Sequence, residues 1–597
     1  MAALSFDVVV VGASFGGVAA ALAAAKYEKT VALIHSGVMV GGQATSQGVT
    51  RWDETAYSQT PNTYGSTMSY RTLKDDIRGW YRANARLAPG VHGATFNPGF
   101  HDPGHPFSVD CNITMTVLDQ LLKDQAEYVT VMLDTSVASA NVGNARIEHI
   151  TLSNGNTVTA PVFVDATDLG ELLPMCGIDW FIGAEATGDT HEPDAERTRS
   201  PGHIQPFTIP IAVERTPDGS SFPVTKPQDY QTLTKYQGFA VYDPNRNGMI
   251  GGVFTSVHRP NPKERGWETI FNYRQYIDHR NFADPNYAND RSTINVGCND
   301  YQAAVIPTGD ADQDADIVKA ARQVSVAYLW WLQNDAPHDD GNGKGYLNLK
   351  VRTDTFGTAD GTAPEPYIRE SRRIAKPLVQ VREQDIQAPK PRRAPTNFKD
   401  SVGVGHYKAD VHKCWGPPGT PYVDAGDIGP FQIPLGSLIA QDCANYVAGC
   451  KNIGATHISG AAYRVHPVEW AIGEAAGTLA AYCAGQGVLP ADVDADAGRV
   501  TALQARLLEQ GAPIFWWDDV SFEDNPRFFA ATQLLGARGT LEGDNSSLNF
   551  DPNGDFPQTA RDAIDQRENH QFDWPAGSLT RGEAAVLICE QLGLPLP

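Results

Sequence analysis

Short apolar runs and a glycine-rich turn mark the start of the chain. Val8–Val11 is a run of valines, typical of a strand that is buried on both faces, and Thr30–Ile34 is a second apolar run of this kind. Between them, residues 12–17 read Gly-Ala-Ser-Phe-Gly-Gly and residues 18–26 are rich in alanine, which predicts a turn and then a helix. The pattern therefore predicts one strand–turn–helix–strand unit over residues 7–35.

A unit of this kind is typical of dinucleotide binding. Its glycines let backbone N–H groups approach a pyrophosphate, and the N-terminus of the helix favours anions. The sequence departs from the usual fingerprint twice, because Ser14 replaces the second glycine and His35 replaces the acidic residue that ends the second strand. The ribose contact must then come from His35, from the backbone or from a residue elsewhere. The residues of the turn expected to contact the cofactor are Gly12, Ser14, Phe15, Gly16 and Gly17.

Four longer strings carry a resemblance to a known family. They are GGQATSQG from residue 41, FVDATDLGELLPMCG from residue 163, YIRESRRI from residue 367 and GATHISGAAYRVHPVEWAIGEAAG from residue 454. With these strings the chain resembles the FAD-dependent oxidoreductases of the glutathione-reductase-like class. The resemblance implies FAD as the cofactor and an α/β fold with a Rossmann-like FAD-binding domain.

The resemblance also implies which later residues hold FAD. The small, polar, flexible loop over residues 41–48 lies where this class has a Gly-Gly pair, and residues 452–457 and 473–477 fit the C-terminal half of the same site. The helix that carries residues 473–477 has Pro467 near its first turn, so its N-terminus is expected to face the flavin. The implied cofactor-binding residues are Gly41, Gly42, Gln43, Ser46, Asp165, Ala166, Thr167, Asn452, Ile453, Gly473 and Ala476.

The domain organisation follows from the same resemblance. An FAD-binding domain is expected from three separated segments, residues 1–60, 105–185 and 430–490, with an α+β substrate domain inserted over residues 186–430. Residues 500–597 resemble one S-layer-homology-like repeat, which predicts a small, mainly helical domain. In that family tandem copies bind cell-wall polymers. Because one copy occurs here, packing on the enzyme or self-association into a homo-oligomer is the favoured role.

Composition narrows the partners and the compartment. The 597 residues contain 47 Lys and Arg against 70 Asp and Glu, a net charge of −23, which disfavours nucleic acid and anionic membranes as partners. The 8 cysteines form no C-x-x-C pair and no cluster with histidine at zinc spacing, so no metal site is expected. The chain starts without a basic stretch, and glycines interrupt its first apolar run. We therefore expect a cytoplasmic protein with no membrane span.

Three histidines lie in segments expected near the flavin. Oxidation of a substrate by a flavin needs a base near the leaving proton, and the pKa of histidine suits that role near neutral pH. His457 and His412 are the candidate bases, whereas His466, beside the start of the last cofactor helix, is expected to be structural.

Two further pairs of residues are candidates for substrate binding. Arg369 and Arg372 could hold a carboxylate or phosphate of the substrate, or could belong to ion pairs between the two domains. Arg51 and Trp52 follow the Gly-Gly loop and could line the pocket, with the indole stacked on a ring.

These features predict an FAD-dependent oxidase or dehydrogenase. It would transfer a hydride from a small organic molecule to flavin N5 and pass the electrons to oxygen or another acceptor. A flavin-dependent monooxygenase is the first alternative, since a hydroxylase can bind NAD(P)H without a second nucleotide fold. A cell-wall or polymer-binding flavoprotein without turnover is the second alternative, and it rests on the C-terminal repeat-like segment.

Overall fold

The structure of the chain is a computed structural model. It describes residues 2–59, 65–91, 93–242, 251–255, 268–388, 396–413, 421, 423, 424, 426, 428–544 and 546–597. At its centre is a five-stranded parallel sheet with the strand order β19-β8-β2-β3-β4. The strands are β2 (Val8–Val11), β3 (Val31–Ile34), β4 (Val129–Met132), β8 (Val162–Asp165) and β19 (Tyr446–Ala448).

The central sheet draws strands from three distant parts of the chain. β2 and β3 come from residues 1–60, β4 and β8 from residues 105–185, and β19 from residues 430–490. In register, Val8 of β2 lies opposite Val31 of β3 and Val162 of β8. The valines of β2 are buried because strands flank them on both sides and helices pack on the sheet.

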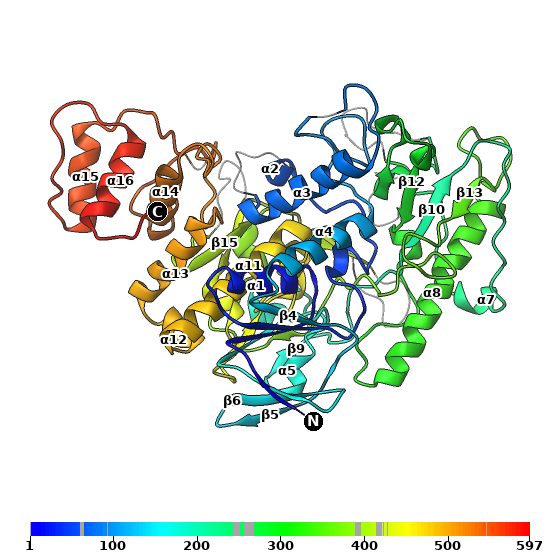
Figure 1. Ribbon diagram of the computed structural model, residues 1–597, viewed down its shortest axis with the longest axis horizontal. Coiled ribbons are helices and arrows are strands. Elements are labelled where there is room, and N and C mark those ends of the chain that lie inside the picture. The colour runs from blue at the N-terminus through cyan, green and yellow to red at the C-terminus, as the bar shows by residue number, and fades with distance from the viewer. Residues whose placement is uncertain are drawn as a thin grey trace.

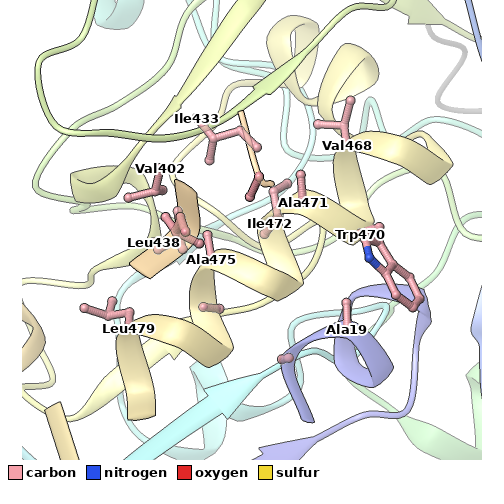
Figure 2. Packing of buried hydrophobic residues seen from close by; sticks show 14 of the residues in the cluster. Ala19, Val402, Ile433, Leu438, Val468, Trp470, Ala471, Ile472, Ala475 and Leu479 are labelled. Carbon is pink, nitrogen blue, oxygen red and sulfur yellow. The ribbon is translucent and has the colours of Figure 1, made fainter. Parts of the chain in front are cut away.

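Two helices pack against each other over this sheet. They are α1 (Phe15–Ala25), which follows the glycine-rich turn, and α11 (His466–Gln486) near the end of the family resemblance. Figure 2 shows α11 between Ala19 of α1 on one side and Val402 and Leu438 on the other. Almost every residue of α1 and of the first five turns of α11 is buried, so both helices belong to the core.

The inserted segment and the C-terminal helices lie at opposite ends of the molecule. Figure 1 shows the C-terminal helices, in orange and red, on one side of the central body and the green strands and long helix of the inserted segment on the other. The inserted segment contains an antiparallel sheet of β11 (Gln275–Ile277), β12 (Arg291–Ile294), β10 (Ile211–Arg215) and β13 (Leu349–Val351), in that order, with α8 (Ala311–Asn334). The C-terminal part contains α12 (Pro490–Asp494), α13 (Ala497–Glu509), α14 (Pro526–Arg538), α15 (Gln558–Glu568) and α16 (Arg581–Gln591).

The remaining elements complete the body. A second sheet has the order β1-β7-β6-β5. Two two-stranded sheets, β14-β9 and β15-β18, join the inserted segment to the body, and a third, β16-β17, lies within the inserted segment. Their bounds, with the other short helices, are β1 (Ala3–Ser5), β5 (Val137–Gly143), β6 (Arg146–Leu152), β7 (Thr157–Thr159), β9 (Trp180–Phe181), β14 (Arg373–Ile374), β15 (Ser401–Gly405), β16 (Asp410–Val411), β17 (Val423–Asp424), β18 (Phe431–Pro434), α2 (Ala56–Gln59), α3 (Met68–Asn84), α4 (Cys111–Asp124), α5 (Leu172–Met175), α6 (Thr187–Thr190), α7 (Tyr230–Leu233), α9 (Glu383–Ile386) and α10 (His457–Tyr463).

Several local features differ from the sequence expectation. The first helix begins at Phe15 rather than at residue 18, because the side chain of Ser14 caps it by accepting the Gly17 N–H. Residues 41–48 are buried and include a 3-10 turn over Gly42–Ala44, so the loop expected to be flexible is part of the core. Within the described ranges, no helix combines the length and the apolar character that crossing a membrane requires.

Part of the expected C-terminal appendage is built into the body. The side-chain amide of Gln504 donates to the carbonyl oxygens of Lys399 and Ser401. The carbonyl oxygen of Ile514 accepts hydrogen bonds from the Ser401 hydroxyl and the Gln432 amide. Residues up to at least 514 are therefore tied to the segment that precedes the last cofactor helix.

Seven of the eight cysteines are described, and all seven are buried thiols without a disulfide. The eighth, Cys414, lies outside the described residues.

Candidate active site

The glycine-rich turn presents unpaired amides at the start of α1. Gly12 has a φ of +95°, and a Cβ there would lie 2.3 Å from the carbonyl oxygen of Ala166, so only glycine fits. In the described part of the chain, the backbone N–H groups of Ala13, Ser14 and Phe15 have no hydrogen-bond partner. Free amides at the N-terminus of a buried helix are the arrangement that binds a phosphate.

One backbone amide of this turn already donates a hydrogen bond to a carboxylate. Glu469 of α11 accepts the Gly16 N–H at 3.1 Å and the side-chain amide of Gln43 at 2.6 Å. The ammonium of Lys451 lies 2.9 Å from the same carboxylate and also pairs with Asp168. Burial lowers the pKa of Lys451, but the neighbouring carboxylates outweigh that effect and hold it well above its ordinary value. A charged ammonium, paired with two carboxylates, therefore stands beside the turn.

The Gly-Gly loop lies against the turn. The Gly41 N–H donates to the carbonyl oxygen of Ala13, and a Cβ at Gly42 would lie 3.0 Å from the Cα of Ser14. Both glycines have positive φ, +102° and +47°. The two segments are thus in contact, as the resemblance implies, and glycine is required at both positions by the backbone geometry.

A cavity of about 200 Å³ opens at the carboxyl ends of β2, β3 and β8. His35 ends β3 and lines this cavity together with Thr167, and residues 135–137 and 365–368 close it. This is the place where a parallel sheet with crossover helices binds the adenosine part of a dinucleotide.

Glu365 supplies the carboxylate that the end of β3 lacks. Its Oε1 is 3.3 Å from Nε2 of His35, and its Oε2 accepts the Ser46 hydroxyl at 2.6 Å. Burial lowers the pKa of His35, and the hydrogen bond and charge of Glu365 reverse that effect and raise it. The acidic residue near the expected ribose position therefore comes from the inserted segment.

The other expected cofactor residues mainly bind one another. Asp165 accepts hydrogen bonds from the N–H and hydroxyl of Thr167, and the side chain of Asn452 donates to the Asp165 carbonyl oxygen. Ile453 is fully buried beside Asn452. On α11, a Cβ at Gly473 would lie 2.0 Å from the carbonyl oxygen of Gly16, so this glycine permits close helix packing. Ala476 is fully buried on the same helix.

A second, smaller cavity lies at the junction with the inserted segment. It has a volume of about 10 Å³, enough for one group the size of a water molecule. Every side chain that lines it is polar except that of Val296. The lining residues are Asp53, Tyr273, Arg274, Asn295, Val296, Gly297, Tyr367, Arg369, Asp410, His412 and Arg464.

His412 lines this cavity and is held by a buried aspartate. Its Nδ1 lies 2.7 Å from Oδ2 of Asp300, and its Nε2 lies 3.5 Å from Oδ2 of Asp410. Asp300 also accepts the Thr208 hydroxyl and pairs with Arg369 at 3.0 Å. Burial raises the pKa of Asp300, but the charge of Arg369 and the hydrogen bonds from His412 and Thr208 lower it below its ordinary value. An ionised Asp300 fixes the Nδ1–H tautomer, so Nε2 can accept a proton.

A chain of hydrogen bonds joins this cavity to the glycine-rich region. The side chain of Gln43 donates to the carbonyl oxygen of Arg464 at 3.0 Å, and the Arg464 guanidinium donates to the Tyr367 hydroxyl at 2.7 Å. That hydroxyl lies 3.4 Å from Asp53, which pairs with Arg274 at 2.8 Å. The Gly-Gly loop and the polar cavity therefore belong to one connected site.

His457, the other candidate base, has different surroundings. It is the first residue of α10, and its Nδ1 lies 3.0 Å from both oxygens of Glu370. Burial lowers the pKa of His457, but the Glu370 carboxylate outweighs it and raises the pKa above its ordinary value. Arg373 pairs with Glu370 and with Glu185, which makes this a compact buried ion-pair cluster.

The candidate substrate-binding residues are engaged by the protein itself. Arg369 donates to Pro206 and Thr208 as well as to Asp300, and Arg372 donates to the carbonyl oxygen of Leu169. Trp52 is fully buried and stacks on His466 with 5.7 Å between ring centres. Arg51 pairs with Glu268 at 2.5 Å. Of these four, Arg369 alone lines the polar cavity.

Taken together, the residues present fit FAD. The unpaired amides and Lys451 would hold the pyrophosphate, the cavity beside His35 and Glu365 would hold the adenosine, and the Gly-Gly loop would contact the flavin side. Sequence reasoning missed Glu365, Lys451 and Glu469. Two of them could have been found in the sequence: Lys451 follows shortly after β19, and Glu469 is the glutamate of the HPVEW string.

The chain belongs to the FAD-dependent oxidoreductase family, whose model matches residues 7–507. It is thus an enzyme with FAD as its cofactor and an α/β, Rossmann-like nucleotide-binding fold. A search of curated protein sequences found no match.

Solved structures match parts of the chain at low identity. The apo Sdh1 complex of Mycobacterium smegmatis is 18% identical over 28% of this chain and 34% of that chain, with a TM-score of 0.21. L-proline dehydrogenase from P. horikoshii is 15% identical over 31% and 24% of the two chains, with a TM-score of 0.16. L-amino acid deaminase from Proteus myxofaciens, in complex with anthranilate, is 13% identical over 37% and 55%, with a TM-score of 0.22. The chain thus spans between 24% and 55% of the length of these proteins.

Proposed function

We propose that the protein oxidises a small organic molecule at the polar cavity, with His412 as the base. The observation that carries this proposal is the pairing of His412 with the buried, ionised Asp300 on the cavity wall. Nε2 of His412 can receive the proton of the reacting group while Asp300 stabilises the resulting imidazolium. FAD, when bound, supplies the hydride acceptor. An oxidase or dehydrogenase is favoured over a monooxygenase because proton abstraction needs such a base.

We assign His457 a different role. Its raised pKa favours the imidazolium form, which donates a proton but does not accept one. It does not line the polar cavity, and its Nε2 is buried without a hydrogen-bond partner in the described part of the chain. We therefore assign His457 a structural role, as a cation of the buried ion-pair cluster with Glu370 and Arg373.

We also infer that the enzyme belongs to the glutathione-reductase-like class. The support is the parallel sheet built from residues 1–60, 105–185 and 430–490, with the insertion over residues 186–430 between two of its strands. For residues 500–597 we propose a role in packing or self-association.

Anaerobic flavin reduction tests the proposed base. Wild type, His412→Asn and His457→Asn are mixed with a panel of alcohols, amines and amino acids while the oxidised flavin band is followed. We expect His412→Asn to retain FAD and to slow reduction by about 10²- to 10⁴-fold, as is typical of lost proton transfer. His457→Asn is the matched control, with less than about a tenfold effect on the rate. Reduction of His412→Asn at the wild-type rate would show that the base lies elsewhere.

A further inference from the structure

The wall of the polar cavity includes a side chain, Asn295, whose polar atoms have no partner among the described residues. Asn295 directly follows β12 and is 2% exposed. In the described part of the chain, neither its amide nitrogen nor its amide oxygen has a hydrogen-bond partner. Buried amides are almost always paired, because an unmade hydrogen bond to a buried group is costly. Asn295 lines the cavity that His412 also lines, so a bound group is the natural partner.

Two of the arginines that line the cavity form ion pairs. Arg274 pairs with Asp53 at 2.8 Å, and Arg369 pairs with Asp300 at 3.0 Å. Neither guanidinium is therefore reserved for a substrate.

Arg464, the third arginine of the lining, is also engaged by the protein. Its guanidinium donates to the backbone carbonyl oxygen of Asp410 at 3.0 Å and to the Tyr367 hydroxyl at 2.7 Å. All three arginines thus donate to groups of the protein, whereas the amide of Asn295 has no partner among the described residues.

We propose that Asn295 binds a hydroxyl group of a neutral alcohol substrate, and this deepens the proposed function and rests on it. A hydroxyl both donates and accepts, so it can pair with the oxygen and the nitrogen of the amide at once. A carboxylate only accepts and an ammonium only donates, so either would leave half of the amide unpaired. The cavity volume of about 10 Å³ matches a single oxygen-sized group. Asn295 is therefore a specificity-determining residue.

Binding of three matched probes to the FAD-loaded enzyme tests this. Propan-2-ol, 2-aminopropane and 2-methylpropanoate share an isopropyl group and present one hydroxyl, one ammonium or one carboxylate. Affinity is measured by perturbation of the flavin absorbance and by calorimetry. We expect wild type to bind propan-2-ol at least tenfold more tightly than either charged probe. Asn295→Leu should lose this preference, and Asn295→Asp should shift it toward the ammonium.

A nearby asparagine provides the control. Asn289 precedes β12, and its amide is already paired with Glu214 at 2.6 Å. Asn289→Leu should leave all three affinities unchanged. In the absence of probe, Asn295→Leu should raise Tm, because leucine removes two unpaired polar atoms from a buried position.

The outcomes separate this inference from the proposed function. Tightest binding of 2-methylpropanoate or of the amine, or affinities that do not depend on Asn295, would overturn the hydroxyl site. Selective propan-2-ol binding by an enzyme in which His412→Asn does not slow flavin reduction would preserve the hydroxyl site and refute the proposed base. Slow flavin reduction by His412→Asn together with unselective binding of the probes would support the proposed base and refute the hydroxyl site.

Discussion

Close packing of α11 on α1 leads to a prediction about Gly473. A Cβ at this position would lie 2.0 Å from the backbone carbonyl oxygen of Gly16, and real Cβ contacts stay above 3.0 Å. In Gly473→Ala the two helices must therefore separate by about 1 Å, and no side-chain rotamer can relieve the clash because both partners are backbone. Overpacking costs up to about 3 kcal/mol, and the better helix propensity of alanine returns about 1 kcal/mol. For 597 residues the entropy of unfolding is about 1.2 kcal/mol per kelvin, so the net loss of about 2 kcal/mol corresponds to a Tm about 2 °C lower.

The same substitution at Gly485 is the matched control. Gly485 lies on the same helix, and its nearest neighbour is the flexible end of Lys29 at 3.5 Å. Gly485→Ala should raise Tm by about 1 °C. Because Gly16 belongs to the phosphate-binding turn, Gly473→Ala should also bind FAD more weakly, as measured by the flavin released on dialysis. A Gly473→Ala protein as stable and as flavin-rich as Gly485→Ala would refute the packing argument.

Two further predictions concern the turn and a buried histidine. Gly12→Asp should yield colourless protein, since its Cβ would lie 2.3 Å from the carbonyl oxygen of Ala166 and its carboxylate would face the phosphates. The control is Gly90→Asp, which lies in open space at a similar φ and should stay yellow. Equal FAD content in the two variants would contradict this prediction. Burial lowers the pKa of His466 to about 3, and its Nδ1 accepts the Asp53 N–H. The unfolded chain, with a histidine pKa of about 6.5, then binds the extra proton between about pH 3 and 6.5, so stability falls as the pH drops through this window, by about 5 kcal/mol at most. When Tm is measured against pH, His466→Asn should lose less stability on acidification than wild type. An unchanged dependence of Tm on pH would show that other groups cause the loss of stability.

The local parts of the fold were predictable from the sequence. The first strand, turn and helix follow from a valine run, glycines that tolerate positive φ, and alanines, all within about 20 residues of one another. The pairing of His412 with Asp300 was not predictable, because more than a hundred residues separate them. The carboxylate beside His35 likewise comes from Glu365 in a distant segment.

The assignment of roles within a motif was also beyond the sequence. Gly473 fits a cofactor motif, but its nearest neighbours are backbone atoms of α1. Arg369 was a candidate for binding an anion, but it is engaged by Asp300, Thr208 and Pro206. Asn295 carried no signal, since an unpaired buried amide is visible only after the fold closes around it. Residue type limits the roles that a side chain can have, and its contacts in the folded protein determine which of these roles it has.

One helix connects the stability of this enzyme with the assembly of its site. α11 lies against α1 through Gly473, and its Glu469 holds both the Gly16 amide and the Gln43 side chain. Gln43 in turn donates to the carbonyl oxygen of Arg464, just before α11, whose guanidinium reaches the polar cavity. A displacement of α11 would therefore move the phosphate-binding turn, the Gly-Gly loop and the cavity wall together. Substitutions in this helix core should weaken FAD binding and substrate selectivity in parallel, because the same contacts maintain both.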